Sequence, residues 1–461
     1  MAGEWASTRL GDVAEINPDA IDRDWPHPHI RYIDISSVGV GQIESPPQWM
    51  KLSDAPSRAK RLVRKGDTVL STVRPNRRSM FFVSQPGDDW VVSTGFAVLR
   101  PNIQLVDARF LYTSVFNQGF TEYLITREKG AAYPAVLPED IASAEIRLPP
   151  LPEQRAIAHI LGTLDDKIEL NRRMNETLEA MARALFKSWF VDFDPVIDNA
   201  QAAGNPIPEE FRDRAAQRAE AAQSAASQGR PFGLPEPLAA QFPNAFHDSD
   251  LGRIPQGWRL GKIEDIAHIN GWTLGSRDNI DVIDYIEISE VMRGDVGKIT
   301  RYTRGEEPSR ARRRLKHGDT ALSTVRPDRG AYFLAVYPPE SLIASTGFAV
   351  LTPKDGNWAF LHATTTQSEF GDELGRLADG GAYPAIRPDV VGNRDIVLPN
   401  DSRQIAAFDD LTQQLYLRRH QNRTESRTVA ALRDTLLPKL LSGELRVNEA
   451  EKFVEAAFDG I

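Results

Sequence analysis

An internal duplication constrains the fold of this 461-residue chain more than any other feature. Short segments of the first half return in the second half, and the distance between partners stays between 250 and 253 residues. The matching pairs are YIDIS at 32–36 with YIEIS at 285–289, PSRA at 56–59 with 308–311, STGFAVL at 93–99 with 345–351, and GAAYPA at 130–135 with GGAYPA at 380–385. The longest pair, 66–77 and 318–329, is identical at ten of twelve positions. A repeat of such constant period predicts two structural units with the same fold.

The local pattern of each copy predicts strands mixed with helices. Segments 68–73 and 91–99 are β-branched or alternating in polarity and lie between Gly, Pro and Asp turns, which is typical of strands. Segments 107–120 and 357–374 have the character of helices. We therefore expect an α+β fold for each copy.

The apolar periodicity changes after each copy. Apolar residues then recur at alternating intervals of four and three, with polar residues at the centre of the run. This spacing is typical of a coiled-coil seam and predicts two helices of about 30 residues, each roughly 45 Å long. The predicted seam residues are Ile157, Leu161, Leu164, Ile168, Asn171, Asn175, Leu178 and Leu185, and then Phe408, Leu411, Leu415, Asn422, Val429, Leu432 and Leu436.

The matching polar centres favour packing of the two helices on each other, with the asparagines fixing the register. The alternative is that each helix packs only on its own domain. The first helix is expected to stop at Asp194-Pro195, and the second around Leu437-Pro438 and Gly443.

These patterns divide the chain into six segments. Two recognition domains are expected at 1–150 and 251–400, and each is followed by a helical region, at 151–195 and 401–445. Residues 196–250 are rich in Ala, Gln and Pro and are interpreted as a linker with a short helix from Glu209 to Ala225. Residues 446–461 form a C-terminal tail.

Composition indicates a globular protein of the cytoplasm. The chain has no cysteine, which fits a reducing compartment and excludes disulfides and thiolate zinc sites. No apolar run approaches the roughly 18 residues that a membrane span needs. The first eleven residues lack a basic head followed by an apolar stretch, so we expect no secretion signal and no membrane partner.

Two basic islands interrupt an acidic background. The net charge of −9 argues against nucleic-acid binding, because phosphates are bound by Lys and Arg. However, residues 51–78 hold nine basic and two acidic side chains, and residues 301–329 hold nine basic and four acidic ones. Recurrence at the same place in both copies favours contact with DNA. The alternative is a solvated run of surface charge.

Turns and loops beside the islands supply further candidates. Arginines follow a strand and a proline turn in both copies, and the loops 130–134 and 380–384 combine Gly, Tyr and Pro. Such a loop lets the backbone approach a partner and lets Tyr pack on a sugar-phosphate edge, although a purely structural turn is the alternative. The candidate DNA-binding residues are Arg58, Lys60, Arg61, Arg64, Lys65, Arg74, Arg77, Arg78, Tyr133, Arg310, Arg312, Arg313, Arg314, Lys316, Arg326, Arg329 and Tyr383.

Motifs for catalysis are missing from the sequence. A glycine-rich phosphate loop ending in Lys-Ser/Thr is absent. Asn17-Pro18-Asp19 matches only the start of the Asn-Pro-Pro-aromatic tetrad of amino-methyltransferases. The histidines lack metal spacing, and the carboxylates form no nuclease signature. We predict a binding protein with neither catalytic residues nor a metal site. The alternatives are a stand-alone nuclease or methyltransferase, and a helical scaffold that binds protein instead of DNA.

Four segments resemble the conserved regions of type I restriction-modification specificity subunits. They are LPPLPEQRAI at 148–157, LFKSWFVDF at 185–193, LGRIPQGW at 251–258 and LPKLLSGEL at 437–445. The resemblance covers the whole chain and implies two target-recognition domains, each reading half of a split site in double-stranded DNA. It also implies an antiparallel coiled coil of the two long helices, with a pseudo-twofold internal repeat. The second copy departs from the pattern at 398–405, where only part of the first copy's leader is kept.

The resemblance implies partners that carry the chemistry. Two modification subunits would bind S-adenosylmethionine and methylate adenine N6, and restriction subunits would use ATP and magnesium. Similar recognition domains should prefer similar half-sites. A pseudo-twofold axis would then make the target nearly palindromic, with half-sites about one turn of DNA apart.

Overall fold

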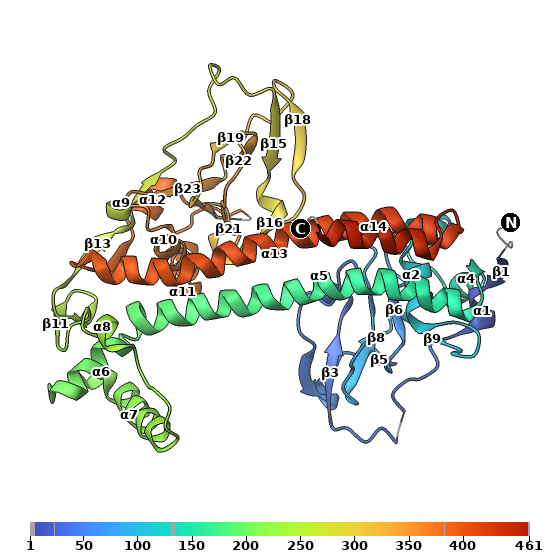
Figure 1. Cartoon of the computed structure of the whole chain (residues 1–461), viewed down its shortest axis with the longest axis horizontal. Coiled ribbons are helices and arrows are strands. Elements are labelled where there is room, and N and C mark those ends of the chain that lie inside the picture. The colour runs from blue at the N-terminus through green and yellow to red at the C-terminus, as the bar shows by residue number, and fades with distance from the viewer. Residues whose placement is uncertain (1–4, 23, 131–133, 382, 460–461) are drawn as a thin grey trace. The chain divides into compact units, whose positions relative to one another are not determined.

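A computed structural model describes residues 5–22, 24–130, 134–381 and 383–459 of the chain (Figure 1). The chain divides into two compact units, Met1–Asn171 with Thr424–Ile461, and Arg172–Arg423. The first unit therefore combines the N-terminal copy with the C-terminal end of the chain. Two long helices, α5 (Leu151–Phe186) and α13 (Ser402–Ser442), contribute residues to both units.

The first unit contains two four-stranded sheets and a two-stranded ribbon. The sheet β2-β9-β6-β7 is antiparallel, whereas the sheet β4-β3-β8-β5 includes the parallel pair β3–β8. The strands are β1 (Ala6–Arg9), β2 (Ala14–Ile16), β3 (His29–Ile33), β4 (Gln48–Lys51), β5 (Ala59–Leu62), β6 (Thr68–Ser71), β7 (Met80–Phe82), β8 (Trp90–Ser93), β9 (Phe96–Pro101) and β10 (Glu145–Leu148). The short helices are α1 (Leu10–Val13), α2 (Ala108–Phe116), α3 (Gln118–Thr126) and α4 (Pro138–Ala142), and the 3₁₀ turns are η1 (Ile35–Ser37), η2 (Leu52–Asp54) and η3 (Pro75–Arg77).

The second unit repeats this arrangement strand by strand. Its sheets have the orders β14-β23-β20-β21 and β18-β15-β22-β19, again with one parallel pair, β15–β22. The repeated strands are β13 (Trp258–Lys262), β14 (Ala267–Ile269), β15 (Val282–Ile286), β18 (Thr300–Thr303), β19 (Ala311–Arg314), β20 (Thr320–Ser323), β21 (Tyr332–Leu334), β22 (Leu342–Ser345), β23 (Phe348–Pro353) and β24 (Asp395–Pro399). The helices are α9 (Ile263–Ile266), α10 (Trp358–Thr365), α11 (Ser368–Arg376) and α12 (Pro388–Gly392), with 3₁₀ turns η6 (Ile288–Glu290) and η7 (Pro327–Arg329). The predicted α+β fold is confirmed, and the sequence repeat is a repeat of topology.

Three predicted elements divide at turns, and one of them, segment 357–374, holds α10 and α11 with Thr366 and Gln367 between them. Segment 91–99 is not one strand, because β8 and β9 belong to different sheets and are joined by a turn at Thr94-Gly95. Segment 107–120 holds α2 and α3, which are separated by Asn117 in an extended conformation (φ −60°, ψ 140°). The Asn117 side chain caps α3 by accepting a hydrogen bond from the Gly119 amide.

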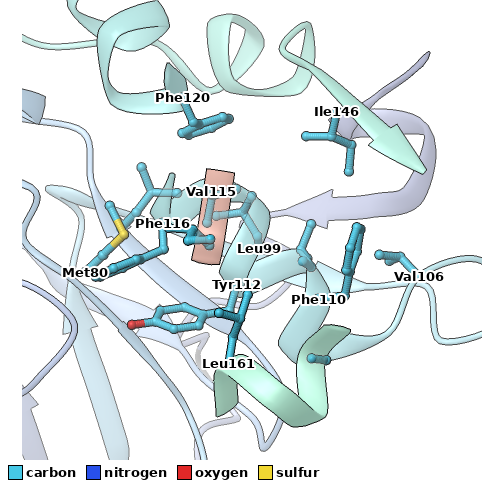
Figure 2. Close-up of a cluster of buried hydrophobic side chains, with 14 of the residues drawn as sticks. Met80, Leu99, Val106, Phe110, Tyr112, Val115, Phe116, Phe120, Ile146 and Leu161 are labelled. Carbon is cyan, nitrogen blue, oxygen red and sulfur yellow. The ribbon is translucent and has the colours of Figure 1, made fainter. Parts of the chain in front are cut away.

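Helix α2 lies at the centre of the hydrophobic core of the first unit (Figure 2). Its buried side chains Phe110, Val115 and Phe116 pack with Leu99 of β9 and with Leu161 of α5. The second unit has an aromatic core instead. Phe190 lies 4.9 Å from Phe360 and 5.4 Å from Phe408, measured between ring centroids.

The two long helices run antiparallel inside each unit. In the first unit, Asp165 of α5 pairs with Arg433 of α13 at 2.7 Å, and the Asn171 amide donates to the Glu425 carboxylate at 2.8 Å. In the second unit, the Asn422 amide of α13 donates to the Asn175 carbonyl oxygen of α5 at 3.0 Å. Partner numbers on α13 fall as those on α5 rise, so the interpretation that the helices pack on each other is correct within each unit.

The segment interpreted as a linker is folded. Residues 194–255 form α6 (Asp194–Ala203), the 3₁₀ turn η5 (Glu209–Phe211), α7 (Arg212–Ser227), α8 (Glu236–Ala239) and the hairpin β11 (Phe246–Ser249) and β12 (Gly252–Pro255). Asp194 is buried and pairs with Arg214 and Arg218 of α7, at 2.7 and 3.1 Å. The apolar pattern missed this because α7 buries only small residues, Ala215 and Ala225.

The predicted stop at Gly443 is confirmed, because α13 ends directly before it, whereas the stops predicted at Asp194-Pro195 and at Leu437-Pro438 are not helix ends. Helix α5 ends at Phe186 and continues as the π-helical segment η4 (Lys187–Val191), and Pro195 lies in the first turn of α6, where proline is tolerated. Pro438 lies inside α13, which ends at Ser442, followed by Gly443 with φ +74°. The predicted tail forms α14 (Val447–Asp459), and its Ala450 belongs to the first core.

The described residues contain no helix that is both long and apolar enough to cross a membrane. A short ribbon, β16 (Val291–Met292) and β17 (Asp295–Val296), is part of the second unit and has no named strand as a counterpart in the described part of the first.

Candidate DNA interface

The basic residues of each island lie in two places on the fold. The strand cations are those on or beside the edge strands β5 and β19, and the turn arginines are those at η3 and η7. The strand cations are Arg58, Lys60, Arg61, Arg64, Lys65, Arg310, Arg312, Arg313, Arg314 and Lys316, and the turn arginines are Arg74, Arg77, Arg78, Arg326 and Arg329. Each predicted island therefore divides into strand cations and turn arginines.

Arg61 and Arg313 are packed into the fold and are not surface cations. They occupy matching positions at a β-bulge, where the pairing with β8 and with β22 shifts register. Both side chains are partly buried, and burial lowers the pKa of each guanidinium. Arg61 Nη1 and Arg313 Nε are buried without a hydrogen-bond partner in the described structure. The bulge that turns these side chains inward has no signature in the sequence.

Carboxylates hold several of the other strand cations. Arg58 pairs with Asp34 at 2.6 Å, and Arg64 pairs with Asp19 at 2.9 Å. In the second unit, Arg312 pairs with Glu307 at 3.1 Å and Arg314 with Asp278 at 2.9 Å. Each of these arginines is at least one-third exposed, so each pair is weakly stabilising and can exchange its carboxylate for a phosphate.

Five cations remain exposed without a recorded ion pair or hydrogen bond from their side chains to the rest of the described chain. They are Lys60, Lys65, Arg77, Arg310 and Arg329. Three come from the first copy and two from the second. These five side chains are therefore available to bind phosphate without breaking an internal contact.

The acidic partner of Arg64 belongs to a buried network that differs between the copies. In the first copy, Arg100 pairs with Asp19 at 2.5 Å and with Asp67 at 2.8 Å, and its hydrogen bond to Asp19 lowers the pKa of that carboxyl group. In the second copy, Thr352 replaces Arg100, and Trp272 replaces Asp19.

Two consequences of this replacement are visible in the second copy. Lys316 is the counterpart of Arg64, and its Nζ lies 2.9 Å from the centroid of a Trp272 ring. The second copy therefore has a cation–π contact where the first has an ion pair. Asp319, the counterpart of Asp67, has no arginine beside it, and burial raises its pKa to about 6. Sequence reasoning overlooked Asp19, Arg100 and Trp272, although the repeat alignment marks the two exchanges.

The turn arginines have a distinctive backbone. Arg74 and Arg326 have φ of +50° and +47°, in the left-handed region that a non-glycine residue rarely adopts. Each amide donates to a proline carbonyl of the Gly-Tyr-Pro loop, to Pro134 at 2.8 Å and to Pro384 at 2.8 Å. The structure thus brings together the turn and the loop that the sequence marked separately.

In the second copy, an aromatic ring lies beside Arg326. The guanidinium carbon of Arg326 lies 4.7 Å from the centroid of the Tyr383 ring, and Tyr383 is 74% exposed. Its counterpart Tyr133 lies outside the described residues.

Arg78, one of the predicted DNA-binding residues, is partly buried and makes internal contacts. Its Nη2 donates to the Phe116 carbonyl at 2.5 Å, and its guanidinium lies 4.8 Å from the Phe116 ring. Burial lowers its pKa. The second copy has Gly330 at this position, with φ +71°, close to the +53° of Arg78.

Most predicted seam residues are buried or partly buried. Buried members are Ile157, Leu161, Leu164, Asn171, Phe408, Asn422, Val429 and Leu436, and partly buried members are Ile168, Asn175, Leu178, Leu185, Leu415 and Leu432. Leu411 is 50% exposed, so its assignment to the seam is wrong. The buried neighbour is Thr412, whose hydroxyl donates to the Phe408 carbonyl at 2.8 Å. Arg419, seven residues further along α13, is also buried and pairs with Glu179.

A polar cluster between α5, α13 and the second copy was also missed. Arg183 and Glu179 of α5 contact the Tyr332 hydroxyl of β21, whose pKa is raised to about 12, mainly by burial. His362 of α10 is buried, and its Nδ1 shares a hydrogen bond with the Thr320 hydroxyl at 3.1 Å. Burial lowers the pKa of His362. These contacts attach the second copy to the helices of its own unit.

Carboxylate and imidazole groups do not gather into a metal site within the described residues. No group of three or more His, Asp or Glu side chains is arranged there to hold an ion.

Comparison with known proteins gives consistent matches. Residues 2–180 match the family model described as the type I restriction modification DNA specificity domain. The chain is 28% identical to the type I restriction enzyme HindI specificity subunit of Haemophilus influenzae, over 96% of this chain and 100% of that protein. It is 22% identical to the MjaIX specificity subunit of Methanocaldococcus jannaschii, over 84% of this chain and 80% of that protein.

A solved structure shares the fold. The type I restriction-modification system S subunit from M. genitalium aligns with a TM-score of 0.52 over 95% of this chain and 96% of that one, at 13% identity.

Proposed function

We propose that this chain is a specificity subunit of a type I restriction-modification system and that each of its two units reads one half of a bipartite, nearly palindromic DNA site. The bound chain directs adenine N6 methylation and restriction by partner subunits to that site. It acts in the cytoplasm as a recognition subunit and performs no catalytic step itself.

One observation carries this proposal most directly. The two units repeat the same strand order, and both present cations at the same edge strand and the same proline turn. A scaffold that binds protein would have no reason to keep cations at matching places in two copies. Two copies of one DNA-reading surface explain both the repeat and the charges, and equivalent surfaces favour equivalent half-sites.

The charge distribution is compatible with this role despite the net charge of −9. Five exposed cations without partners among the described residues are available for phosphates, and the exposed ion pairs of Arg58 and Arg64 cost little to exchange. Phosphate contacts position a protein on DNA, whereas contacts with base edges supply specificity. The strand cations are suited to the first task.

Partners supply the chemistry in this proposal. Two modification subunits bind S-adenosylmethionine and methylate the target adenine, and restriction subunits use ATP and magnesium. The long helices α5 and α13 and the segments at their ends, including η4, are the elements to which modification subunits dock.

The experiment that tests DNA recognition measures affinity against salt concentration for the complex with its modification subunits. The triple variant Lys60→Ala, Lys65→Ala and Arg77→Ala removes exposed cations that have no recorded partner. Each lost phosphate contact should reduce the slope of log K against log salt by about 0.9, so the loss for three is about 2.7.

A matched control removes three cations elsewhere, by Arg212→Ala, Arg230→Ala and Lys452→Ala. This control should leave the slope unchanged. An equal loss of slope in both triple variants would mean that the effect comes from net charge alone. A complex that assembles but shows no salt-dependent binding of DNA would favour the protein-binding scaffold.

A further inference from the structure

The conformation of Arg74 and Arg326 is costly and is nevertheless kept in both copies. A non-glycine residue in the left-handed region is destabilised by roughly 1–2 kcal/mol. Both arginines adopt it, at φ +50° and +47°, directly before the proline of the turn. Strain of this kind persists where the surrounding structure imposes it, and it concentrates at functional sites.

The surroundings that impose this conformation are the same in both copies. The Arg74 amide donates to the Pro134 carbonyl and the Arg326 amide to the Pro384 carbonyl, each at 2.8 Å. One residue further along each loop, Ala135 bridges Val73 and Ala385 bridges Val325. The turn is thus fastened on one side to its sheet and on the other to the Gly-Tyr-Pro loop, which fixes the direction in which the arginine leaves the backbone.

The side chain of Arg326 is also positioned. Its guanidinium carbon lies over the Tyr383 ring, 4.7 Å from the ring centroid, and Tyr383 is 74% exposed. The guanidinium is a planar fork in which two N–H donors can donate side by side to one acceptor pair. The contact with the ring also reduces the conformational entropy that the side chain loses on binding.

The other cations of the interface lack this combination. Arg329 lies at the end of the same 3₁₀ turn, exposed and without a recorded stacking ring among the described residues. Arg58, Arg64, Arg312 and Arg314 are held by carboxylates, and Arg78 is held by the Phe116 carbonyl. A fixed backbone and a fork over an aromatic ring suit recognition of a base, whereas an exposed cation on a flexible stem suits a phosphate.

We infer that Arg326, seated on Tyr383, reads a guanine edge in the second half-site and that Arg74 reads the equivalent guanine in the first, whereas Arg329 and Arg77 contact phosphates. The inference rests on the proposed function and assigns specificity to named residues. Bidentate donation to guanine O6 and N7 is the commonest specific arginine contact in the major groove. The two half-sites therefore share a G·C pair at the same position.

The test maps N6-methyladenine across a genome in cells that express this chain with its modification subunits. Three variants of one turn are compared, namely Arg326→Gly, Arg326→Lys and Arg329→Ala. Glycine suits φ +47° without strain, so Arg326→Gly removes the side chain and relieves the backbone. Lysine keeps the charge and loses the fork. Co-purification of each variant with the modification subunits reports folding.

The expected result is that both Arg326 variants accept other bases at one position of one half-site, with discrimination against the wrong base reduced roughly 10–100-fold. Arg329→Ala should lower methylation at all sites and leave the motif unchanged. Arg74→Lys should relax the same position of the other half-site.

An Arg326→Gly protein that methylates the wild-type motif with unchanged strictness would overturn the inference. So would relaxation of the same base by Arg329→Ala. If the wild-type complex methylates no bipartite motif, the proposed function fails as well, and that outcome is distinguished by the wild-type map alone.

Discussion

Asp67 and Asp319 occupy the same place in the two copies, yet only Asp67 has an arginine beside it. Arg100 donates to Asp67 through Nε and Nη2, at 3.0 and 2.8 Å. Thr352 stands at the Arg100 position of the second copy, where Asp319 Oδ1 is buried without a hydrogen-bond partner in the described structure. A buried carboxylate without a cation costs free energy in its charged form.

This difference predicts a pH-dependent stability that originates in the second copy. The pKa of Asp319 is about 6 in the folded chain, against 3.8 for an unperturbed carboxyl group, so the folded state binds more protons between these pH values. The contribution of Asp319 to the free energy of unfolding should therefore fall as pH rises from about 4 to about 6, by about 3 kcal/mol, and stay constant above. Asp319→Asn should remove this loss and raise the stability at pH 8 by about 1–3 kcal/mol. Thermal unfolding of wild type and variant at pH 4.5 and pH 8 measures it.

The matched control is Asp67→Asn in the first copy. It removes charge from a carboxylate that Arg100 already compensates, so it should destabilise the chain at pH 8, opposite in sign to Asp319→Asn. Loss of stability in both variants would show that the two aspartates have equivalent environments and would contradict the account.

At the scale of the helices, buried asparagines define how α5 and α13 align within each unit. Asn422 donates through Nδ2 to the Asn175 carbonyl oxygen at 3.0 Å in the second unit, and Asn171 donates to Glu425 at 2.8 Å in the first. Asn171 and Asn422 are fully buried. Polar groups at seam positions fix register at a cost in stability.

Removing one partner of a buried hydrogen bond costs more free energy than removing both, which makes the Asn175–Asn422 pair testable. Asn422→Ala leaves the Asn175 carbonyl oxygen without this donor and should cost about 1–3 kcal/mol. The double variant Asn175→Leu with Asn422→Leu removes donor and acceptor together and should be near neutral or stabilising. Chemical denaturation of the single and double variants measures the coupling. Strictly additive effects would contradict a direct contact between the two side chains.

Sequence periodicity predicted the first long helix better than the second. Apolar side chains mark the seam of α5 from Ile157 to Leu164, and they are buried. In α13 the seam passes through Thr412 and Arg419, which are buried because each has an internal partner, the Phe408 carbonyl and the Glu179 carboxylate. A pattern of apolar residues cannot reveal such positions, so it chose the exposed Leu411.

The sequence predicted where the candidate interface lies, but not which of its cations are exposed, paired with carboxylates or buried. The islands lie at the edge strands and turns where basic residues recur. However, the carboxylates of Asp34 and Asp19 come from segments well before the arginines that they hold, and a β-bulge turns Arg61 and Arg313 inward. These outcomes depend on tertiary contacts and strand register, which no local pattern encodes.

At the scale of the whole molecule, duplication explains more than any single site. One topology occurs twice, with the same sheet orders, the same strained turn arginine and the same fastening of that turn to a Gly-Tyr-Pro loop. The copies differ in replacements such as Asp19 by Trp272 and Arg78 by Gly330, and in the β16–β17 ribbon of the second copy. Two surfaces this similar should recognise half-sites that are similar without being identical at every base.

Mapping N6-methyladenine in a methylation-free host that expresses the wild-type chain with the proposed modification subunits tests whether the duplicated units read DNA in equivalent ways. We expect one bipartite motif, with two half-sites that read alike on opposite strands and an unread spacer between them. A motif with two unrelated halves, or a single continuous motif, would contradict the claim that the duplicated units read DNA in equivalent ways.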